Sequence, residues 1–186
     1  MIEIEPIEDE DNFAFSTIVT YPRKTQISHG MYTNKVDMMN MITMIKTNIV
    51  HKDKIKGVCN VVGGRTEWDF FNDKPEFHRF MEYIFKKNYR ANPFFTENKW
   101  NPHEFKVDAW GNELKKGHYV KLHQHLYTHI ILYLTEGNPL IIPELKITIK
   151  PKIGSYYIFE PYILHNVPEV TDDKARYNMI INMREK

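Results

Sequence analysis

The sequence predicts an α+β protein that is mainly β, built as a jelly-roll barrel with helices packed on its outside. Two observations carry this prediction. Short apolar runs separated by turn signals follow one another from Glu104 to the C-terminus, a pattern typical of a sandwich or a jelly-roll barrel. Helical patterns mixed with short strands come before Trp100, so these helices would cover the barrel from outside.

Length and composition favour one folded domain. A chain of 186 residues suits a single domain, which we expect to span 1–186, with 1–100 as a supporting region and 101–186 as the barrel core. The 25 basic and 24 acidic residues nearly balance, which argues against a dedicated nucleic-acid binder. A hydrophobic fraction of 42% excludes a disordered chain. With Cys59 as the only cysteine, no internal disulfide can form.

Four elements are expected before Trp100. They are a strand over Phe13–Tyr21, a helix over Lys35–Val50, a short strand over Lys56–Val62 and a helix over Pro75–Lys87 that Asn72 or Asp73 would cap. The first helix carries Met38, Met41, Met44, Ile45 and Ile49 on one side. We interpret that side as core packing, with a partner-binding surface as the alternative.

Seven strands are expected after Glu104. They are Phe105–Asn112, Tyr119–His125, Thr128–Leu134, Leu140–Pro143, Leu145–Lys150, Ser155–Glu160 and Tyr177–Met183. The expected turns are Gly111-Asn112, Lys116-Gly117, Gly137-Asn138-Pro139 and Lys152-Ile153-Gly154.

Nothing in the sequence indicates secretion or membrane insertion. The first eleven residues are acidic where a signal peptide has a basic start and an apolar run. No stretch approaches the ~20 apolar residues of a membrane helix. We therefore expect a soluble cytoplasmic protein.

Histidines provide the candidate functional site. His123 and His125 lie two residues apart in an expected strand, so both side chains point to one face and can reach one metal ion. The best third ligand is His165, which follows an expected strand end. His129 has the same parity and remains open as a ligand, a supporting group or a substrate contact. Neutral imidazoles suit Zn, Fe, Cu and Ni, so these residues alone do not choose the metal.

Arg176 is the second candidate. It begins the last expected strand, in which Arg176, Asn178, Ile180 and Asn182 share a parity. A buried arginine inside a barrel needs an anion, and its planar guanidinium matches a carboxylate in a two-point contact. A small dicarboxylate would satisfy it. The alternative is a solvent-exposed arginine at a strand start.

An ordered set of short motifs runs from Gly64 to the C-terminus. It comprises the upstream helix Pro75–Lys87, Trp110-Gly-Asn112, Gly117, His123-Gln-His125, Tyr133-Leu134, Pro151-Lys-Ile-Gly154, Phe159-Glu-Pro161, His165, Arg176 and Ile181-Asn182. With these spacings the sequence resembles the iron(II)/2-oxoglutarate-dependent oxygenases, in particular small members common in phage and marine bacterial genomes. The resemblance implies a double-stranded β-helix, a cupin-like jelly roll.

The resemblance also implies site roles. His123 and His165 match metal ligands, and His125 stands where the wider superfamily has Asp or Glu. Arg176 matches the arginine that binds the far carboxylate of 2-oxoglutarate, and Asn112 lies on a strand that often contacts this cosubstrate. Asn178 and Tyr133 complete the expected cofactor-binding set. The implied cofactors are Fe(II), 2-oxoglutarate and O₂.

Two other functions stay open. One is a cupin that binds metal through three histidines without 2-oxoglutarate, such as a dioxygenase of another kind. The other is a non-catalytic binding protein on the same barrel. The substrate of an oxygenase would be a small molecule or a peptidyl residue, without a membrane or nucleic-acid partner. An exposed strand edge could pair two copies. The resemblance also leaves open that a phage gene encodes the protein, which would then be expressed in the cytoplasm of the host.

Overall fold

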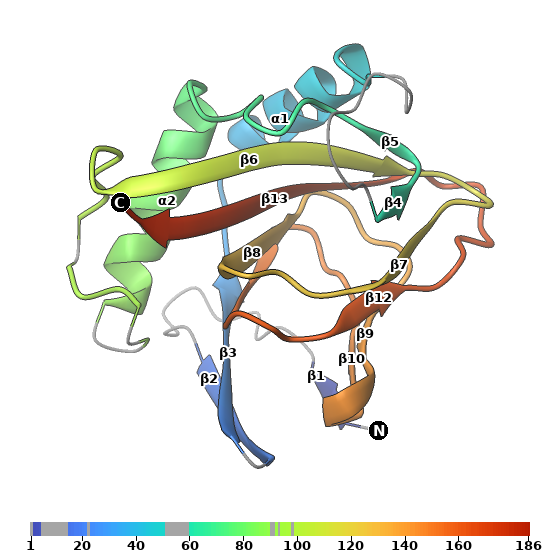
Figure 1. Cartoon of the computed structure of the whole chain (residues 1–186). Coiled ribbons are helices and arrows are strands. Elements are labelled where there is room, and N and C mark those ends of the chain that lie inside the picture. The colour runs from blue at the N-terminus through green and yellow to red at the C-terminus, as the bar shows by residue number, and fades with distance from the viewer. Residues whose placement is uncertain are drawn as a thin grey trace.

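The barrel is formed by two β-sheets that face each other (Figure 1). This computed structural model describes residues 2–4, 15–21, 23–50, 60–89, 92, 94–97 and 99–186. The predicted strand residues 13–14 and 56–59, with Cys59 among them, lie outside the described part of the chain.

One sheet has seven strands in the order β2-β3-β11-β8-β13-β6-β5. Their bounds are β2 Phe15–Tyr21, β3 Arg23–Met31, β5 Gly64–Arg65, β6 Phe105–Leu114, β8 Thr128–Tyr133, β11 Ser155–Phe159 and β13 Arg176–Glu185. All of these pairs are antiparallel. The ten-residue strands β6 and β13 pair along their whole length.

The other sheet has six strands in the order β1-β10-β9-β12-β7-β4. Their bounds are β1 Ile2–Ile4, β4 Val61–Val62, β7 Tyr119–His123, β9 Leu140–Ile142, β10 Ile147–Ile149 and β12 His165–Val167. β1 runs parallel to β10, and the other pairs are antiparallel.

From β6 onward the chain crosses repeatedly between the two sheets, with β9 and β10 as a hairpin within one of them. β6, β8, β11 and β13 lie in the seven-stranded sheet, whereas β7, β9, β10 and β12 lie in the six-stranded one. This winding is the double-stranded β-helix, so the predicted fold class is confirmed.

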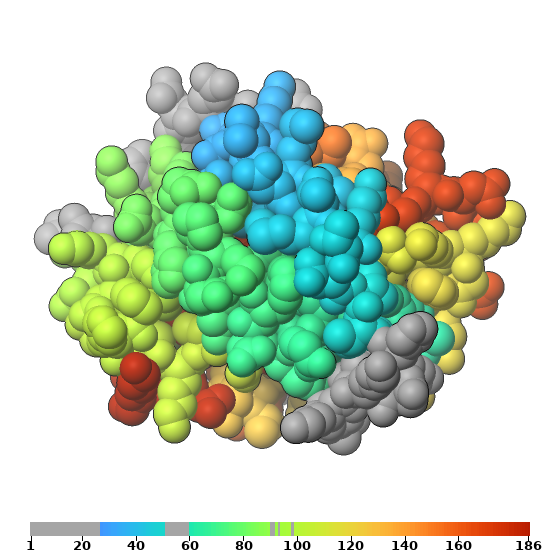
Figure 2. Space-filling model, turned by 90° about the horizontal axis from the view of Figure 1, so that it is seen from above, coloured from blue at the N-terminus to red at the C-terminus, as the bar shows by residue number. Residues whose placement is uncertain are grey.

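The helices cover the outer face of the seven-stranded sheet, as expected. α1 (Lys35–Thr47) lies against β6 and β13, α2 (Pro75–Asn88) packs beside α1, and the two helices dominate that side of the molecule (Figures 1 and 2). Met38, Met41 and Ile45 of α1 are buried in a cluster between helices and sheet, so the methionine side of this helix packs in the core. A second apolar cluster fills the space between the two sheets. No described helix has the length and apolar character needed to cross a membrane.

The predicted turn at Gly111-Asn112 is wrong. Both residues lie inside β6, where Gly111 pairs with Met179 and Asn112 with Asn178. The glycine is needed for close packing, since a Cβ atom at position 111 would collide with the side chain of Ile45 on α1.

The predicted cap of the second helix is also wrong. The N-cap residue is Lys74, without a capping side-chain hydrogen bond. Asn72 instead ties the segment before α2 to the sheet, because its amide nitrogen donates to the Val107 carbonyl at 2.8 Å and its amide oxygen accepts from the Ala109 N–H at 3.1 Å. A tertiary contact therefore replaces the local one.

Other boundaries differ in detail. β7 ends at His123 rather than His125, and α1 ends at Thr47 rather than Val50. The predicted strand Leu145–Lys150 is shortened to β10, because Pro143–Leu145 form a 3-10 turn that Lys146 ends in the left-handed conformation at φ 55°. The strands β1, β3, β5 and β12 were not predicted.

Gly111→Ala should destabilise the fold. The added methyl group meets Ile45 between α1 and β6, and overpacking of a core typically costs about 1–3 kcal/mol. Chemical denaturation measures the free energy of unfolding. In an Ile45→Ala background the same Gly111→Ala change should cost much less. An equal cost in both backgrounds would show that helix packing does not explain the glycine.

Candidate metal and anion site

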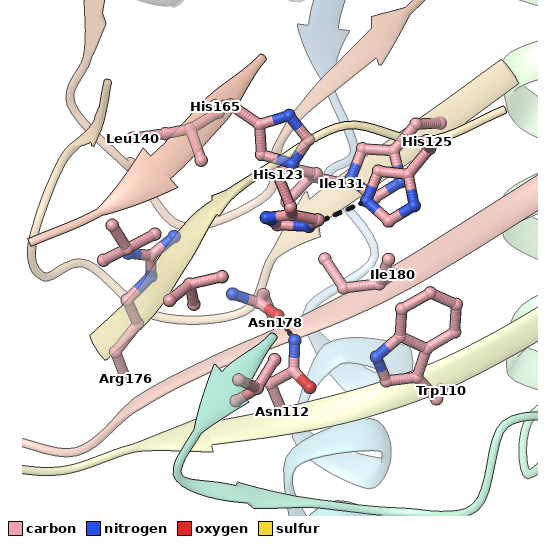
Figure 3. A pocket seen from close by; sticks show the side chains of 14 residues that line it. Trp110, Asn112, His123, His125, Ile131, Leu140, His165, Arg176, Asn178 and Ile180 are labelled. Carbon is pink, nitrogen blue, oxygen red and sulfur yellow. Dashed lines mark hydrogen bonds between the residues drawn. The ribbon is translucent and has the colours of Figure 1, made fainter. Parts of the chain in front are cut away.

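The pairing of β7 with β12 brings two distant histidines together. His123 is the last residue of β7, His165 is the first of β12, and the two are direct partners in the strand register. His125 follows β7 by two residues and turns back to the same place. One potential ligand nitrogen from each of the three rings lies within 4.8 Å of the others. Figure 3 shows the rings clustered at one side of a pocket.

Backbone carbonyls fix the orientation of two of these rings. Nδ1 of His123 lies 2.8 Å from the Lys121 carbonyl oxygen, and Nδ1 of His165 lies 2.9 Å from that of Ile163. A carbonyl oxygen only accepts, so each Nδ1 carries the proton and each Nε2 keeps a free lone pair. Nε2 of His123 lies 3.1 Å from Nε2 of His125. This is the usual arrangement of a metal-ligating histidine held by an outer partner.

His129 lies beside the cluster but is not aimed at its centre. It belongs to β8, and its ring stacks on that of His125 with 3.8 Å between centroids and 10° between planes. Imidazole lone pairs lie in the ring plane, so two rings stacked face to face do not converge on one ion. Nδ1 of His129 is instead 2.8 Å from Oδ1 of Asn182. The geometry therefore separates His129 from the three candidate ligands.

The environment keeps all four imidazoles neutral. Burial lowers the pKa of His125 to about 2, with a further contribution from the neighbouring His123 and His165. Burial and His123 lower the pKa of His165 to about 4, although the Ile163 carbonyl opposes the shift. Burial likewise lowers the pKa values of His123 and His129. Neutral imidazole is the form that binds metal.

Arg176 lies at the other end of the same pocket (Figure 3). The first residue of β13, it is 1% exposed. Nη1 donates to the Asn138 carbonyl at 2.6 Å, and the guanidinium lies 4.9 Å from the centre of the Tyr133 ring. Its Nε has no hydrogen-bond partner, and no ion pair involves Arg176, among the described residues. Arginine stays protonated in proteins, so a positive charge is buried here without a counter-ion.

The remaining predicted residues surround this end. Asn112 and Asn178 are direct partners on β6 and β13, and Nδ2 of Asn112 donates to Oδ1 of Asn178 at 3.1 Å. Oδ1 of Asn112 and the buried Tyr133 hydroxyl lack partners among the described residues. The two asparagines line the pocket, whereas Tyr133 lies next to the arginine behind the lining.

No acidic residue lines the pocket in the part of the chain that the structure describes. The lining is formed by Val61, Trp110, Asn112, Val120, His123, His125, His129, Ile131, Leu140, His165, Val167, Arg176, Asn178 and Ile180. The enclosed space is ≈ 40 Å³, which holds about three water molecules at roughly 10–15 Å³ each. Three neutral nitrogen ligands and one unpaired cation therefore share a small, mostly apolar cavity.

Asn182 was missed as a functional residue. Its amide touches two imidazoles, since Oδ1 meets Nδ1 of His129 and Nδ2 lies 3.2 Å from Nδ1 of His125. The signal was present in the sequence, because Asn182 shares the inward parity of Arg176 on the last strand.

The fold and the site define a double-stranded β-helix with a candidate metal centre. The chain matches no protein-family model, and no curated protein matches its sequence. Solved structures do match. They include a viral collagen prolyl hydroxylase from Paramecium bursaria Chlorella virus-1 in complex with 2-oxoglutarate, at TM-score 0.60 and 15% identity over 86% of this chain and 96% of that one.

Two further structures are similar. A prolyl-4-hydroxylase from Pseudomonas putida has a TM-score of 0.60 and 9% identity over 86% of this chain and 92% of that one. HygX from Streptomyces hygroscopicus, with nickel and 2-oxoglutarate bound, has a TM-score of 0.60 and 9% identity over 87% and 84%. The resemblance to 2-oxoglutarate/Fe(II) oxygenases is therefore confirmed at the level of the fold.

The stability of the metal-free protein should fall with acid. Unfolded histidines bind protons below a pKa of about 6.5, whereas His125 and His165 bind them only near 2 and 4. The unfolded state therefore gains more protons than the folded state as the pH falls from about 6.5 to about 4. Each such histidine then lowers the free energy of unfolding by up to about 1.4 kcal/mol per pH unit. Urea unfolding at several pH values measures this slope. His125→Gln should make it shallower, and an unchanged slope would contradict the assignment.

His165→Ala should lose metal binding while keeping the fold. The change removes one of the three converging nitrogens. Loss of a hydrogen-bond partner behind a ligand lowers metal affinity roughly 10–100-fold, and loss of the ligand itself should lower it further. Chelator competition with Zn²⁺ measures the affinity, and circular dichroism checks the fold. His129→Ala is the matched control and should weaken zinc binding no more than about 10-fold. Greater loss in the control would make His129 the ligand.

Proposed function

We propose that the protein is an Fe(II)- and 2-oxoglutarate-dependent oxygenase of the hydroxylase type. One observation carries the proposal. A buried guanidinium, which has no anionic partner among the described residues, shares one pocket with three neutral imidazoles that turn toward one another. A metal ion and a dicarboxylate would satisfy both ends together. Two of the similar structures contain bound 2-oxoglutarate, and one of them also contains nickel, which supports a metal and a dicarboxylate as the ligands of this pocket.

The donor set fits a divalent transition metal. His123, His125 and His165 would hold the ion, and their neutral nitrogens suit Fe(II). A three-residue shell leaves coordination positions for a cosubstrate and for O₂. When bound, the iron supplies the O₂-dependent oxidation, coupled to oxidative decarboxylation of 2-oxoglutarate.

Arg176 would bind the far carboxylate of the cosubstrate. Its Nε has no hydrogen-bond partner among the described residues, and none of those that line the pocket carries a competing carboxylate. The contact with the Asn138 carbonyl and the Tyr133 ring holds the guanidinium in place. A fixed cation opposite the metal sets the direction of the cosubstrate, and the apolar side chains of the pocket exclude water.

One wall of the pocket is a short edge strand. Val61 lies in the two-residue strand β4, which among the described strands pairs with β7. Short edge elements open at low cost, so we expect this wall to move.

The substrate would approach from the opposite side of the histidines. The inward side chains of β13 extend from Arg176 in the pocket to Asn182 beside His125. Beyond Asn182 lies an open groove of ≈ 640 Å³. Its lining includes Leu126, Tyr127, Tyr162, Met183 and Arg184. The backbone N–H of Tyr162 donates to the His125 carbonyl at 2.8 Å, which links the groove to a candidate ligand. We assign this groove to a small molecule or a peptidyl residue.

Cosubstrate binding tests the proposal directly. Anaerobic Fe(II) with 2-oxoglutarate should give a visible metal-to-ligand charge-transfer band. Arg176→Met keeps much of the side-chain volume without the charge, so it should weaken 2-oxoglutarate binding by about 2–5 kcal/mol as a lost buried charge contact. Titration of the band measures the affinity. Lys116→Met, at an exposed ion pair, is the control and should bind normally.

Two results would redirect the assignment. Loaded iron without a charge-transfer band would favour the cupin that uses three histidines and no 2-oxoglutarate. A protein that never takes up iron would favour a non-catalytic binding protein.

A further inference from the structure

Asn182 links a candidate metal ligand to the stacked histidine beside it. It pairs directly with His129 across β13 and β8, and its single amide group reaches Nδ1 of both His125 and His129. Each end of an amide has one chemical role, because the oxygen accepts and the nitrogen donates. The amide therefore dictates where both imidazoles carry their protons.

In the structure the amide selects the tautomer of His125 that does not bind metal through Nε2. Nδ2 of Asn182 donates to Nδ1 of His125, so the His125 proton lies on Nε2, 3.1 Å from the free Nε2 of His123. Oδ1 of Asn182 accepts from Nδ1 of His129, so that proton lies on Nδ1. These hydrogen bonds therefore link the three imidazoles and the amide without a metal ion.

Metal binding requires the opposite arrangement. Nε2 of His125 is the nitrogen that faces the other ligands, and it must lose its proton to coordinate. A neutral His125 then carries the proton on Nδ1, which needs an acceptor. Rotation of the Asn182 amide by half a turn supplies Oδ1 to His125 and presents Nδ2 to His129, whose Nδ1 must now accept.

We propose that Asn182 is a positioning residue whose amide turns over when a metal binds, and that this exchange switches the tautomers of His125 and His129 together. Each ring exchanges one proton between its two nitrogens through water, so no net proton is gained or lost. This inference rests on the proposed function only for metal binding by His123, His125 and His165. The tautomer of His129, which is not a ligand, would therefore report whether a metal is bound.

Histidine ¹⁵N NMR of the full chain tests the switch with Zn²⁺ as the probe. The metal-free protein should show His125 protonated on Nε2 and His129 on Nδ1. With zinc bound, His125 should be protonated on Nδ1 and His129 on Nε2. An unchanged His129 tautomer in the zinc-bound protein would overturn the proposal while leaving the metal site standing. Failure of zinc to bind the three histidines would overturn both.

Two variants separate positioning from a structural role. The carboxylate of Asn182→Asp accepts from both Nδ1 atoms, so His129 should stay protonated on Nδ1 with and without zinc, and zinc affinity should not fall. Asn182→Leu provides no hydrogen bond and should weaken zinc binding about 10–100-fold.

Tyr177→Phe is the control, because Tyr177 lies on the same strand but not in the described pocket lining, and the change also removes a buried side-chain hydrogen bond, from its hydroxyl to Oε1 of Glu113 at 2.7 Å. Its zinc affinity should equal that of the unmodified chain. Equal affinity in Asn182→Leu and Tyr177→Phe would contradict the role of Asn182, and so would a tautomer switch that persists in Asn182→Asp.

Discussion

The antiparallel pairing of β7 with β12 is the constraint on which the site depends. It sets His123 opposite His165, although 42 positions separate them in the sequence. Each ring is then held by a carbonyl two residues before it, at Lys121 and at Ile163. The same local geometry thus recurs on two strands, and their register brings the two free nitrogens to one point. A slip of one strand by one residue would turn the ring on that strand to the other face and separate the pair.

Charge is distributed unevenly in the pocket. The imidazoles are neutral because burial lowers their pKa values, whereas Arg176 keeps its charge because guanidinium does not titrate in the accessible range. Holding a buried cation without a partner costs several kcal/mol. The fold meets part of that cost with the Asn138 carbonyl and the Tyr133 ring. The rest is available to bind an anion, which explains why an apparently unfavourable feature can persist in a functional pocket.

Much of this arrangement was predictable from sequence because it depends on period-two patterns. The alternation in the last strand placed Arg176 and Asn178 on the inner face, and the spacing of short strands gave the barrel. What failed depended on contacts between distant segments. Gly111 was predicted to form a turn, because the sequence does not show that Ile45 packs against it. Asn72 was predicted to cap a helix, because the sequence does not show its hydrogen bonds to β6. His125 lies beyond the end of β7, so its convergence comes from the turn rather than from strand parity. Likewise, the stacking of His129 on His125 was invisible to parity, which left its role open.

In the proposed function, a histidine at position 125 in place of an acidic ligand would change the electrostatics of the whole pocket. A divalent metal held by three neutral imidazoles keeps its full charge of two, and Arg176 adds one more at the far end. A dicarboxylate with two negative charges would then be attracted at both ends, more strongly than where a ligating carboxylate has already offset part of the metal charge. The same substitution creates a new requirement, because an imidazole, unlike a carboxylate, must place its remaining proton. In the proposed switch, Asn182 would meet that requirement once its amide turns Oδ1 toward His125, from the same inward row of β13 that provides Arg176. One strand would thus provide both the cation that orients the anion and the amide that prepares the ligand.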